Sequence, residues 1–287
     1  MLTSTVIEID GQTSGAEPVP GHLVHAWLLK SVVLPRDPAL AEVLHSDHAG
    51  KPFTVSSLGW RPDDRGGAVG EVRVTAFTPR LVSVIDSLTP DAIALTNIGR
   101  TRLRVRAIHR EPGSHPYAWR ETWGGLVERA GAIPSGVGVS LTFTSPTAFA
   151  SSLQNMAALF PLPQLVFRRL ALVWNAHAPA SMEVDEAQVE RLIAGLYIDQ
   201  YDLQTRTARL RHQTTRGFTG RCDYRCEASL PLELQQLAHR LATLALFAGV
   251  GMRTTQGLGQ TIAAPIQTKR ARATRALRTR RLYQGAV

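Results

Sequence analysis

The sequence predicts an α+β protein of two tandem ferredoxin-like domains, and three observations lead to this fold class. The elements predicted between residues 5 and 108 follow the order β-α-β-β-α-β, which defines one ferredoxin-like unit. The same order recurs between residues 137 and 264 without obvious repetition of the sequence. Between them, residues 110–134 contain Pro-Gly, His-Pro and Gly-Gly steps, which predict the connection between the domains.

The first domain begins with a strand and two helices. Residues 5–9 predict the strand. The run 23–33 predicts a helix, which Pro35 ends because proline lacks an amide donor and its ring clashes with the preceding turn. Asp37 is a good N-cap for a second, short helix that ends at His45, and proline suits the position that follows the cap. The rest of the domain consists of predicted strands at 53–56, 70–77 and 92–108 and a helix at 80–88.

The second domain repeats this order with a longer central hairpin. We expect a strand at 137–143, helices at 164–175, 186–195 and 232–247, a hairpin of 206–212 with 220–228, and a last strand at 258–264. The predicted boundaries are an N-terminal domain of residues 1–112, a connecting segment of 113–135, a C-terminal domain of 136–266 and a basic tail of 267–287.

The positive net charge of the chain favours a polyanionic partner, but the basic residues are unevenly distributed along the sequence. Net charge is +9 over 287 residues, and 44% of the residues are hydrophobic, as in globular proteins. The tail carries seven basic residues and no acid, so subtracting these seven leaves +2 for the body. We interpret the tail as a solvated extension that adds salt-sensitive, non-specific affinity if it meets RNA.

Other features exclude several classes of protein. The cysteines, Cys222 and Cys226, have no second Cys or His pair nearby, so we expect reduced thiols and neither a metal site nor a cofactor. The longest apolar run, residues 241–252, is too short to span a bilayer and is broken by glycine. Acidic residues near the N-terminus rule out a signal peptide. These features predict a cytoplasmic protein with no membrane partner.

A glycine-rich loop, residues 249–259, reads G-x-G-x₅-G-x-G. Glycines at this density indicate backbone with positive φ or a close approach by another backbone. The loop follows a predicted helix and leads into a strand. A Rossmann fingerprint has the opposite context, and a P-loop needs Gly-Lys-Ser/Thr, so a nucleotide-cofactor loop is not indicated.

Four segments together resemble one family. They are residues 44–56 (LHSDHAGKPFTVS), 141–149 (LTFTSPTAF), 217–221 (GFTGR) and the glycine-rich loop. In this order and spacing the chain resembles the Cas6 family of CRISPR-associated endoribonucleases, within the RAMP superfamily. The resemblance covers residues 1 to about 265. It implies RRM-like domains with an RNA-binding cleft between or across them.

The resemblance also implies an activity and its partners. Such enzymes cleave CRISPR repeat RNA in precursor transcripts without metal or cofactor. The 2′-hydroxyl attacks the adjacent phosphate and leaves 2′,3′-cyclic phosphate and 5′-hydroxyl ends. Repeat RNA (pre-crRNA) is the expected partner, and CRISPR effector-complex subunits or a second copy of the chain stay open as protein partners.

Candidate catalytic residues follow from the L-H-x₅-K-x-F-T pattern of residues 44–54. His45 matches the family's catalytic histidine, and imidazole suits proton transfer near neutral pH, as acid or as base. Lys51 matches a lysine that stabilises charge on the phosphate. Lys30 occupies the position of a tyrosine found in some relatives, where it is a candidate charge stabiliser or a solvated lysine. Alternative histidines are His22, His25 and His48.

Candidate RNA-binding residues lie in the C-terminal domain. They comprise the loop residues Gly249, Gly251, Arg253, Thr254, Gly257 and Gly259, and Arg216 and Arg221 beside the predicted hairpin. Packing between the domains is an alternative role for the glycines. Arg102, Arg104 and Arg106 alternate on one strand face and suit a phosphate track or a solvated surface.

Two other functions remain open from the sequence. One is a non-catalytic RNA-binding subunit of a CRISPR effector complex on the same fold, against which the L-H-x₅-K segment argues. The other is a metal-dependent nuclease, which is disfavoured because the sequence contains no compact Asp/Glu cluster with ligand spacing.

Overall fold

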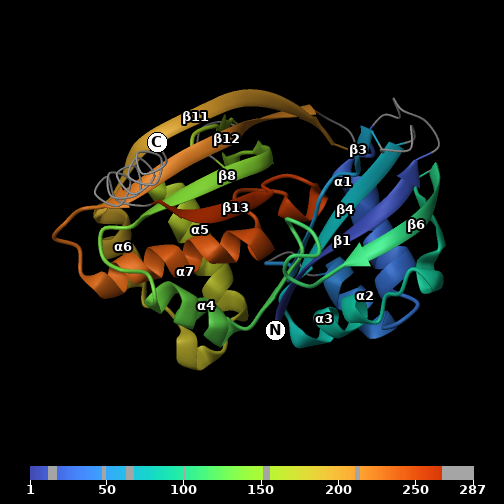
Figure 1. Ribbon diagram of the computed structural model, residues 1–287, viewed down its shortest axis with the longest axis horizontal. Coiled ribbons are helices and arrows are strands. Elements are labelled where there is room, and N and C mark those ends of the chain that lie inside the picture. The colour runs from blue at the N-terminus through green and yellow to red at the C-terminus, as the bar shows by residue number, and fades with distance from the viewer. Residues whose placement is uncertain are drawn as a thin grey trace, which may run out of the picture.

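A computed structural model describes residues 1–11, 18–46, 50–62, 68–99, 101–150, 156–210 and 214–266. The predicted basic tail and His48 lie outside these residues. Two large antiparallel sheets lie side by side, one in each half of the chain, and helices cover one face of each (Figure 1). The mixed α/β fold predicted from the sequence is confirmed.

The first sheet has the strand order of a ferredoxin-like unit extended by one strand, β2-β4-β1-β6-β5. All of its pairs are antiparallel. Its strands are β1 (Leu2–Gly11), β2 (Phe53–Val55), β4 (Ala68–Ala76), β5 (Leu95–Ile98) and β6 (Thr101–His109), with β3 (Gly59–Pro62) added to β4. The expected single strand at 92–108 is a hairpin, because Gly99, with φ of +65°, turns the chain between β5 and β6.

Helices α1 (Gly21–Trp27), α2 (Pro38–Ser46) and α3 (Pro79–Asp86) pack against this sheet. The predicted helix at 23–33 is α-helical only as far as Trp27 and continues as a π-helix, η1 (Leu28–Val33). The predicted cap of the next helix is confirmed, since the Leu40 amide donates to Asp37 Oδ1 at 3.0 Å. Asp37 also pairs with Arg80 at the start of α3, with Arg80 Nε 2.6 Å from Asp37 Oδ2.

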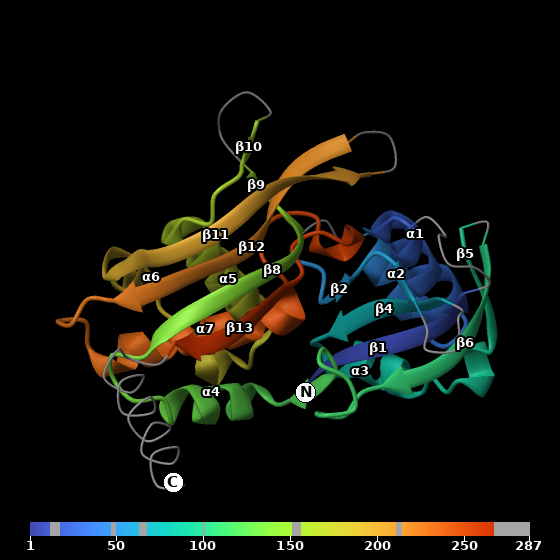
Figure 2. The same ribbon diagram turned by 45° about the horizontal axis from the view of Figure 1, so that its top comes forward.

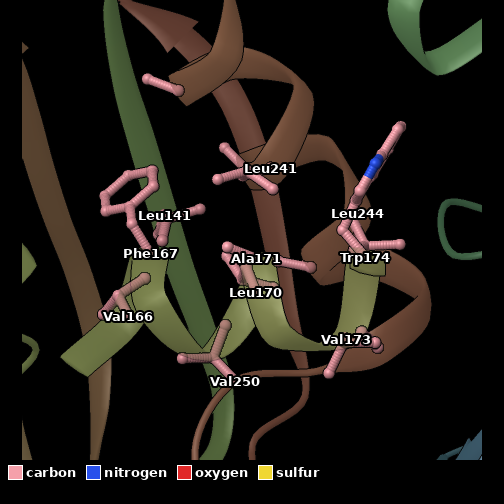
Figure 3. Close-up of a cluster of buried hydrophobic side chains, with 14 of the residues drawn as sticks. Leu141, Val166, Phe167, Leu170, Ala171, Val173, Trp174, Leu241, Leu244 and Val250 are labelled. Atoms are coloured by element: carbon pink, nitrogen blue, oxygen red, sulfur yellow. The ribbon is translucent and has the colours of Figure 1, made fainter. Parts of the chain in front are cut away.

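The second sheet repeats the ferredoxin-like strand order as β11-β12-β8-β13. Its strands are β8 (Gly138–Thr147), β11 (Leu196–Arg209), β12 (Thr214–Cys226) and β13 (Thr261–Ile266). Helices α5 (Pro163–His177), α6 (Glu186–Ala194) and α7 (Leu232–Ala248) lie beneath it in Figure 1. Its largest buried cluster joins Phe167, Leu170 and Trp174 of α5 to Leu241 and Leu244 of α7 (Figure 3).

Part of the predicted connection, residues 113–135, carries regular structure. Strand β7 (Trp119–Glu121) pairs with β1, so it extends the first sheet. Helix α4 (Trp123–Gly131) packs against α7, and its Trp123 ring meets Trp174 edge-on at a centroid distance of 5.1 Å. Figure 2 shows α4 along the lower edge of the second half of the protein. The connection therefore contributes buried surface to both halves.

Contacts between the two halves fix the surroundings of the site. Thr75 Oγ1 of β4 donates to the Phe247 carbonyl of α7 at 2.6 Å. Phe77 follows β4 but is buried in the hydrophobic core of the second half. Ser56 and Gly257 form a parallel backbone bridge. Helix α1 and strand β2 also contact residues 254–256, so the glycine-rich loop lies against the first half. Within the described residues, no helix is long and apolar enough to cross a membrane.

Candidate active site

Two histidines and a lysine form the candidate site, and one of them, His25, contacts the glycine-rich loop. His25 lies on α1, His45 lies in the last turn of α2, and Lys51 lies in the segment that enters β2. Burial lowers the pKa of His25 below its ordinary value of 6.5; a hydrogen bond to the Thr255 carbonyl raises this pKa, and the charges of Lys51 and His45 lower it. Because both side chains act electrostatically on His25, we treat the three as one candidate site.

His25 is held by the glycine-rich loop. Its Nδ1 is 2.8 Å from the Thr255 carbonyl oxygen, and its ring packs against Phe53 at a centroid distance of 5.4 Å. A carbonyl only accepts hydrogen bonds, so Nδ1 carries a proton and donates it. In the neutral ring Nε2 is then the acceptor. His25 is therefore oriented with one nitrogen fixed and the other available to take a proton.

His45 and Lys51 are placed by the end of α2. The His45 side chain is exposed, whereas the preceding Leu44 is buried in the core. Lys51 Nζ donates to the Leu44 carbonyl at 2.6 Å, which holds the ammonium group against the helix end that carries His45. Between them Gly50, with φ of +67°, turns the chain, and its carbonyl accepts a hydrogen bond from His177 Nε2 at 2.7 Å. The turn is thus anchored to α5 of the second half.

The other predicted catalytic candidates lie away from this site or outside the residues that the structure describes. Lys30 is exposed in η1, and no described hydrogen bond or ion pair connects it with His25, His45 or Lys51. His22 lies at the start of α1 and is partly exposed. His48 lies outside the described residues. Sequence reasoning gave His25 only as an alternative, because its contact with Thr255 joins residues 230 positions apart.

The four glycines of the glycine-rich loop are buried where the two halves meet. Gly249, Gly251, Gly257 and Gly259 all have positive φ and are buried. At Gly257, with φ of +92°, a Cβ would lie 2.7 Å from Ser57 Oγ and 3.0 Å from the Gly21 Cα. The backbone here lies so close to Gly21 of α1 and to Ser57 that this position needs glycine. The loop carries η4 (Thr254–Gln256), which presents the Thr255 carbonyl to His25.

The basic residues predicted to bind RNA differ in their surroundings. Arg253 is exposed at the loop with φ of +57°, and Thr254 beside it is partly exposed. Arg216 is exposed on β12. Arg221, also on β12, makes two hydrogen bonds to Asp223, of 2.7 and 2.6 Å, and these raise its pKa. Asp223 already balances the charge of Arg221. Arg221 is therefore less suited than Arg216 to bind a phosphate.

A row of three arginines is exposed along β6. Arg102, Arg104 and Arg106 project from the side opposite to the buried Leu103 and Val105. The alternation expected from the sequence is therefore present. This side of the sheet is the one that the helices leave uncovered.

No group of three or more side chains suited to holding a metal ion occurs in the described part of the chain. Cys222 and Cys226 are free thiols, and burial raises the pKa of each to about 11. Both thiols therefore stay protonated at neutral pH and are poor nucleophiles or metal ligands.

Comparison with known proteins places this arrangement in a family. Residues 141–261 match the model of the CRISPR-associated endoribonuclease Cas6. This match in the C-terminal half of the chain, together with the matches to solved Cas6 structures, supports a CRISPR-associated Cas6 endoribonuclease. The same matches support an endoribonuclease with a role in processing CRISPR repeat RNA. The resemblance inferred from its four sequence segments is thereby confirmed.

Solved structures of Cas6 proteins share the fold over nearly the whole chain. Thermus thermophilus Cas6 matches at 25% identity with a TM-score of 0.69, covering 92% of this chain and 98% of that one. A Cas6 product complex matches at 24% identity with a TM-score of 0.75, covering 92% and 100%. A Cas6-related protein of Pyrococcus furiosus matches at 12% identity with a TM-score of 0.56, covering 94% and 100%. No curated protein matches the chain significantly.

Proposed function

We propose that the protein cleaves CRISPR repeat RNA in precursor transcripts by internal transesterification and without a metal ion. In this reaction the RNA supplies its own nucleophile, the 2′-hydroxyl next to the scissile phosphate. The protein has to accept the proton of that hydroxyl, donate a proton to the leaving 5′-oxygen and stabilise the extra negative charge on the phosphate. The observation that carries the proposal is that His25, His45 and Lys51 lie together.

Each of the three residues suits one of these tasks. His25, with Nδ1 bonded to the Thr255 carbonyl and a lowered pKa, is neutral at pH 7, so its Nε2 takes the proton of the 2′-hydroxyl. The 2′-oxygen then attacks phosphorus, and the bond to the 5′-oxygen breaks. His45 donates the proton that the leaving oxygen needs, and the Lys51 ammonium offsets the phosphate charge. The products are a 2′,3′-cyclic phosphate and a 5′-hydroxyl.

The pH dependence of cleavage tests the role of His25. A base works when deprotonated, and the pKa of His25 is lowered. The single-turnover rate should therefore rise with pH along an acid limb whose midpoint lies below 6.5. His25→Ala should remove this limb. An acid limb with its midpoint above 6.5, or one that survives in His25→Ala, contradicts the assignment.

Removal of metal separates this proposal from a scaffold role and from a metal-dependent nuclease. Saturating protein is incubated with its cognate repeat RNA in excess EDTA, and cleavage is followed in a single turnover. We expect a rate within about two-fold of that with magnesium, since no step uses a metal. Intact RNA under both conditions would favour the non-catalytic RNA-binding subunit, and cleavage with magnesium alone would favour the metal-dependent nuclease.

A further inference from the structure

The chain is hydrogen-bonded on both sides of Lys51, the proposed charge stabiliser. The carbonyl before it, that of Gly50, accepts a bond from His177 Nε2 at 2.7 Å. The carbonyl after it, that of Pro52, accepts a bond from the Phe77 amide at 3.1 Å. A carbonyl only accepts hydrogen bonds, so His177 Nε2 carries the proton that is donated. The backbone of Lys51 is thus held from both ends.

The two residues that hold this segment also contact each other. The His177 ring meets the Phe77 ring edge-on, with the centroids 4.8 Å apart. Phe77 is 2% exposed and belongs to the hydrophobic core of the second half, although it directly follows β4 of the first. Aromatic contacts of this geometry are favourable. Phe77 therefore helps to keep the imidazole in the orientation that reaches the Gly50 carbonyl.

His177 lies on a braced helix end, because it is the last residue of α5. In the same turn Trp174 is fully buried in the core (Figure 3), and its Nε1 donates to the Met182 carbonyl at 2.7 Å. The side-chain amide of Asn175 exchanges two hydrogen bonds with the backbone of Val184, of 2.8 and 2.9 Å. A donor on such a rigid element fixes its acceptor more precisely than a donor on a loop does.

The ammonium group of Lys51 depends on this backbone for its position. A lysine side chain is a flexible four-carbon stem with a compact charge at its end. Its Nζ donates to the Leu44 carbonyl at 2.6 Å, beside the helix end that carries His45. This bond requires the Lys51 backbone to lie at a set distance from α2, and the turn at Gly50, with φ of +67°, sets the path of the chain there. Electrostatic stabilisation is strongest when the charge is in place before the reaction.

We propose that His177 is a positioning residue for the reaction: from the second half of the protein, it holds the turn at Gly50 so that the Lys51 ammonium group faces the phosphate. The inference rests on the proposed function, in which Lys51 offsets the phosphate charge. In this role the imidazole serves as a hydrogen-bond donor and transfers no proton. Cleavage by residues of the first half therefore depends on a side chain of the second half.

Two substitutions separate the hydrogen bond from the ring. His177→Phe keeps an aromatic ring against Phe77 and removes the donor. His177→Gln keeps a donor at similar reach, because the glutamine amide nitrogen is as many bonds from the backbone as Nε2 is. His239→Phe is the matched control. His239 Nε2 makes the same kind of bond, 2.9 Å long, to the Val137 carbonyl just before β8 rather than to the segment of Lys51.

The measurement is the single-turnover rate of repeat cleavage over a range of protein concentrations, with thermal unfolding to confirm that each variant is folded. We expect His177→Phe to lower the maximal rate by about ten-fold, as for a displaced catalytic group, while the protein concentration at half-maximal rate changes by less than about two-fold. His177→Gln should recover most of the lost rate. His239→Phe should cleave like wild type even if its thermal midpoint falls.

Coupling to Lys51 distinguishes positioning from a general loss of stability. In a Lys51→Ala background, the group that His177 positions is already gone. His177→Phe should then lower the rate by less than about two-fold, so that the two substitutions are far from additive. Additive losses, a wild-type rate in His177→Phe, or no recovery in His177→Gln would each overturn the inference.

Hydrogen exchange tests the same contact without catalysis and so keeps the inference separate from the proposed function. Exchange of the Phe77 amide reports its bond to the Pro52 carbonyl, on the far side of Lys51. We expect this amide to exchange about two- to ten-fold faster in His177→Phe than in wild type, His177→Gln or His239→Phe. If exchange is faster but the wild type does not cleave repeat RNA, the proposed function fails and His177 still holds the segment. Unchanged exchange would overturn the inference.

Discussion

Replacement of His45 by alanine should lower the single-turnover rate of repeat cleavage by about 10²–10⁴-fold, the usual contribution of a positioned general acid. The His45 side chain is exposed, so its loss leaves no cavity in the core. The thermal midpoint and the affinity for repeat RNA should therefore stay close to wild type. Ser46→Ala, one residue further along the same helix end, is the matched control and should cleave normally.

A modified substrate shows whether the effect of His45 is proton donation. When the leaving 5′-oxygen is replaced by sulfur, the leaving group is a weak base and needs no acid. His45→Ala should then cleave this phosphorothiolate at nearly the wild-type rate, whereas His25→Ala should remain slow. If the sulfur substrate rescues His25→Ala instead, the two roles are reversed. If it rescues neither variant, His45 is not the acid.

Much of the fold could be predicted from the sequence because local signals agree with it. Asp37 and Pro38 mark the start of α2, Pro35 ends the preceding helix, and strand-like patterning marks β1 and β4. The order of elements then restricts the topology to two ferredoxin-like sheets, and both sheets show that strand order. Local sequence was a good guide at these elements.

The hairpin of β11 and β12 shows where such signals fail. It begins at Leu196 rather than near residue 206, since most of β11 is exposed on both faces and so lacks a hydrophobic alternation. The switch from α1 to a π-helix likewise leaves no mark in the residue types. In both cases the structure is set by pairing or packing with distant segments.

The candidate site could be predicted only in part, for a related reason. The spacing of His45 and Lys51 is local, so a sequence pattern reveals it. The contact of His25 with Thr255 spans 230 positions, and the bond from Arg73 to Gln260 spans 187. Neither Arg73 nor Gln260 differs in the sequence from an ordinary strand residue. Only the fold shows that the glycine-rich loop orients a histidine and that Gln260 bonds to a buried arginine.

The most direct test of internal attack removes a single oxygen atom from the RNA. A repeat substrate with one 2′-deoxy nucleotide at the cut lacks the nucleophile but keeps every phosphate, and phosphates dominate the affinity of proteins for nucleic acids. We expect no cleavage of this RNA over many half-lives of the unmodified substrate, with binding changed by no more than about three-fold. Cleavage of the deoxy substrate at the same position would contradict internal attack, and with it the roles proposed for His25, His45 and Lys51.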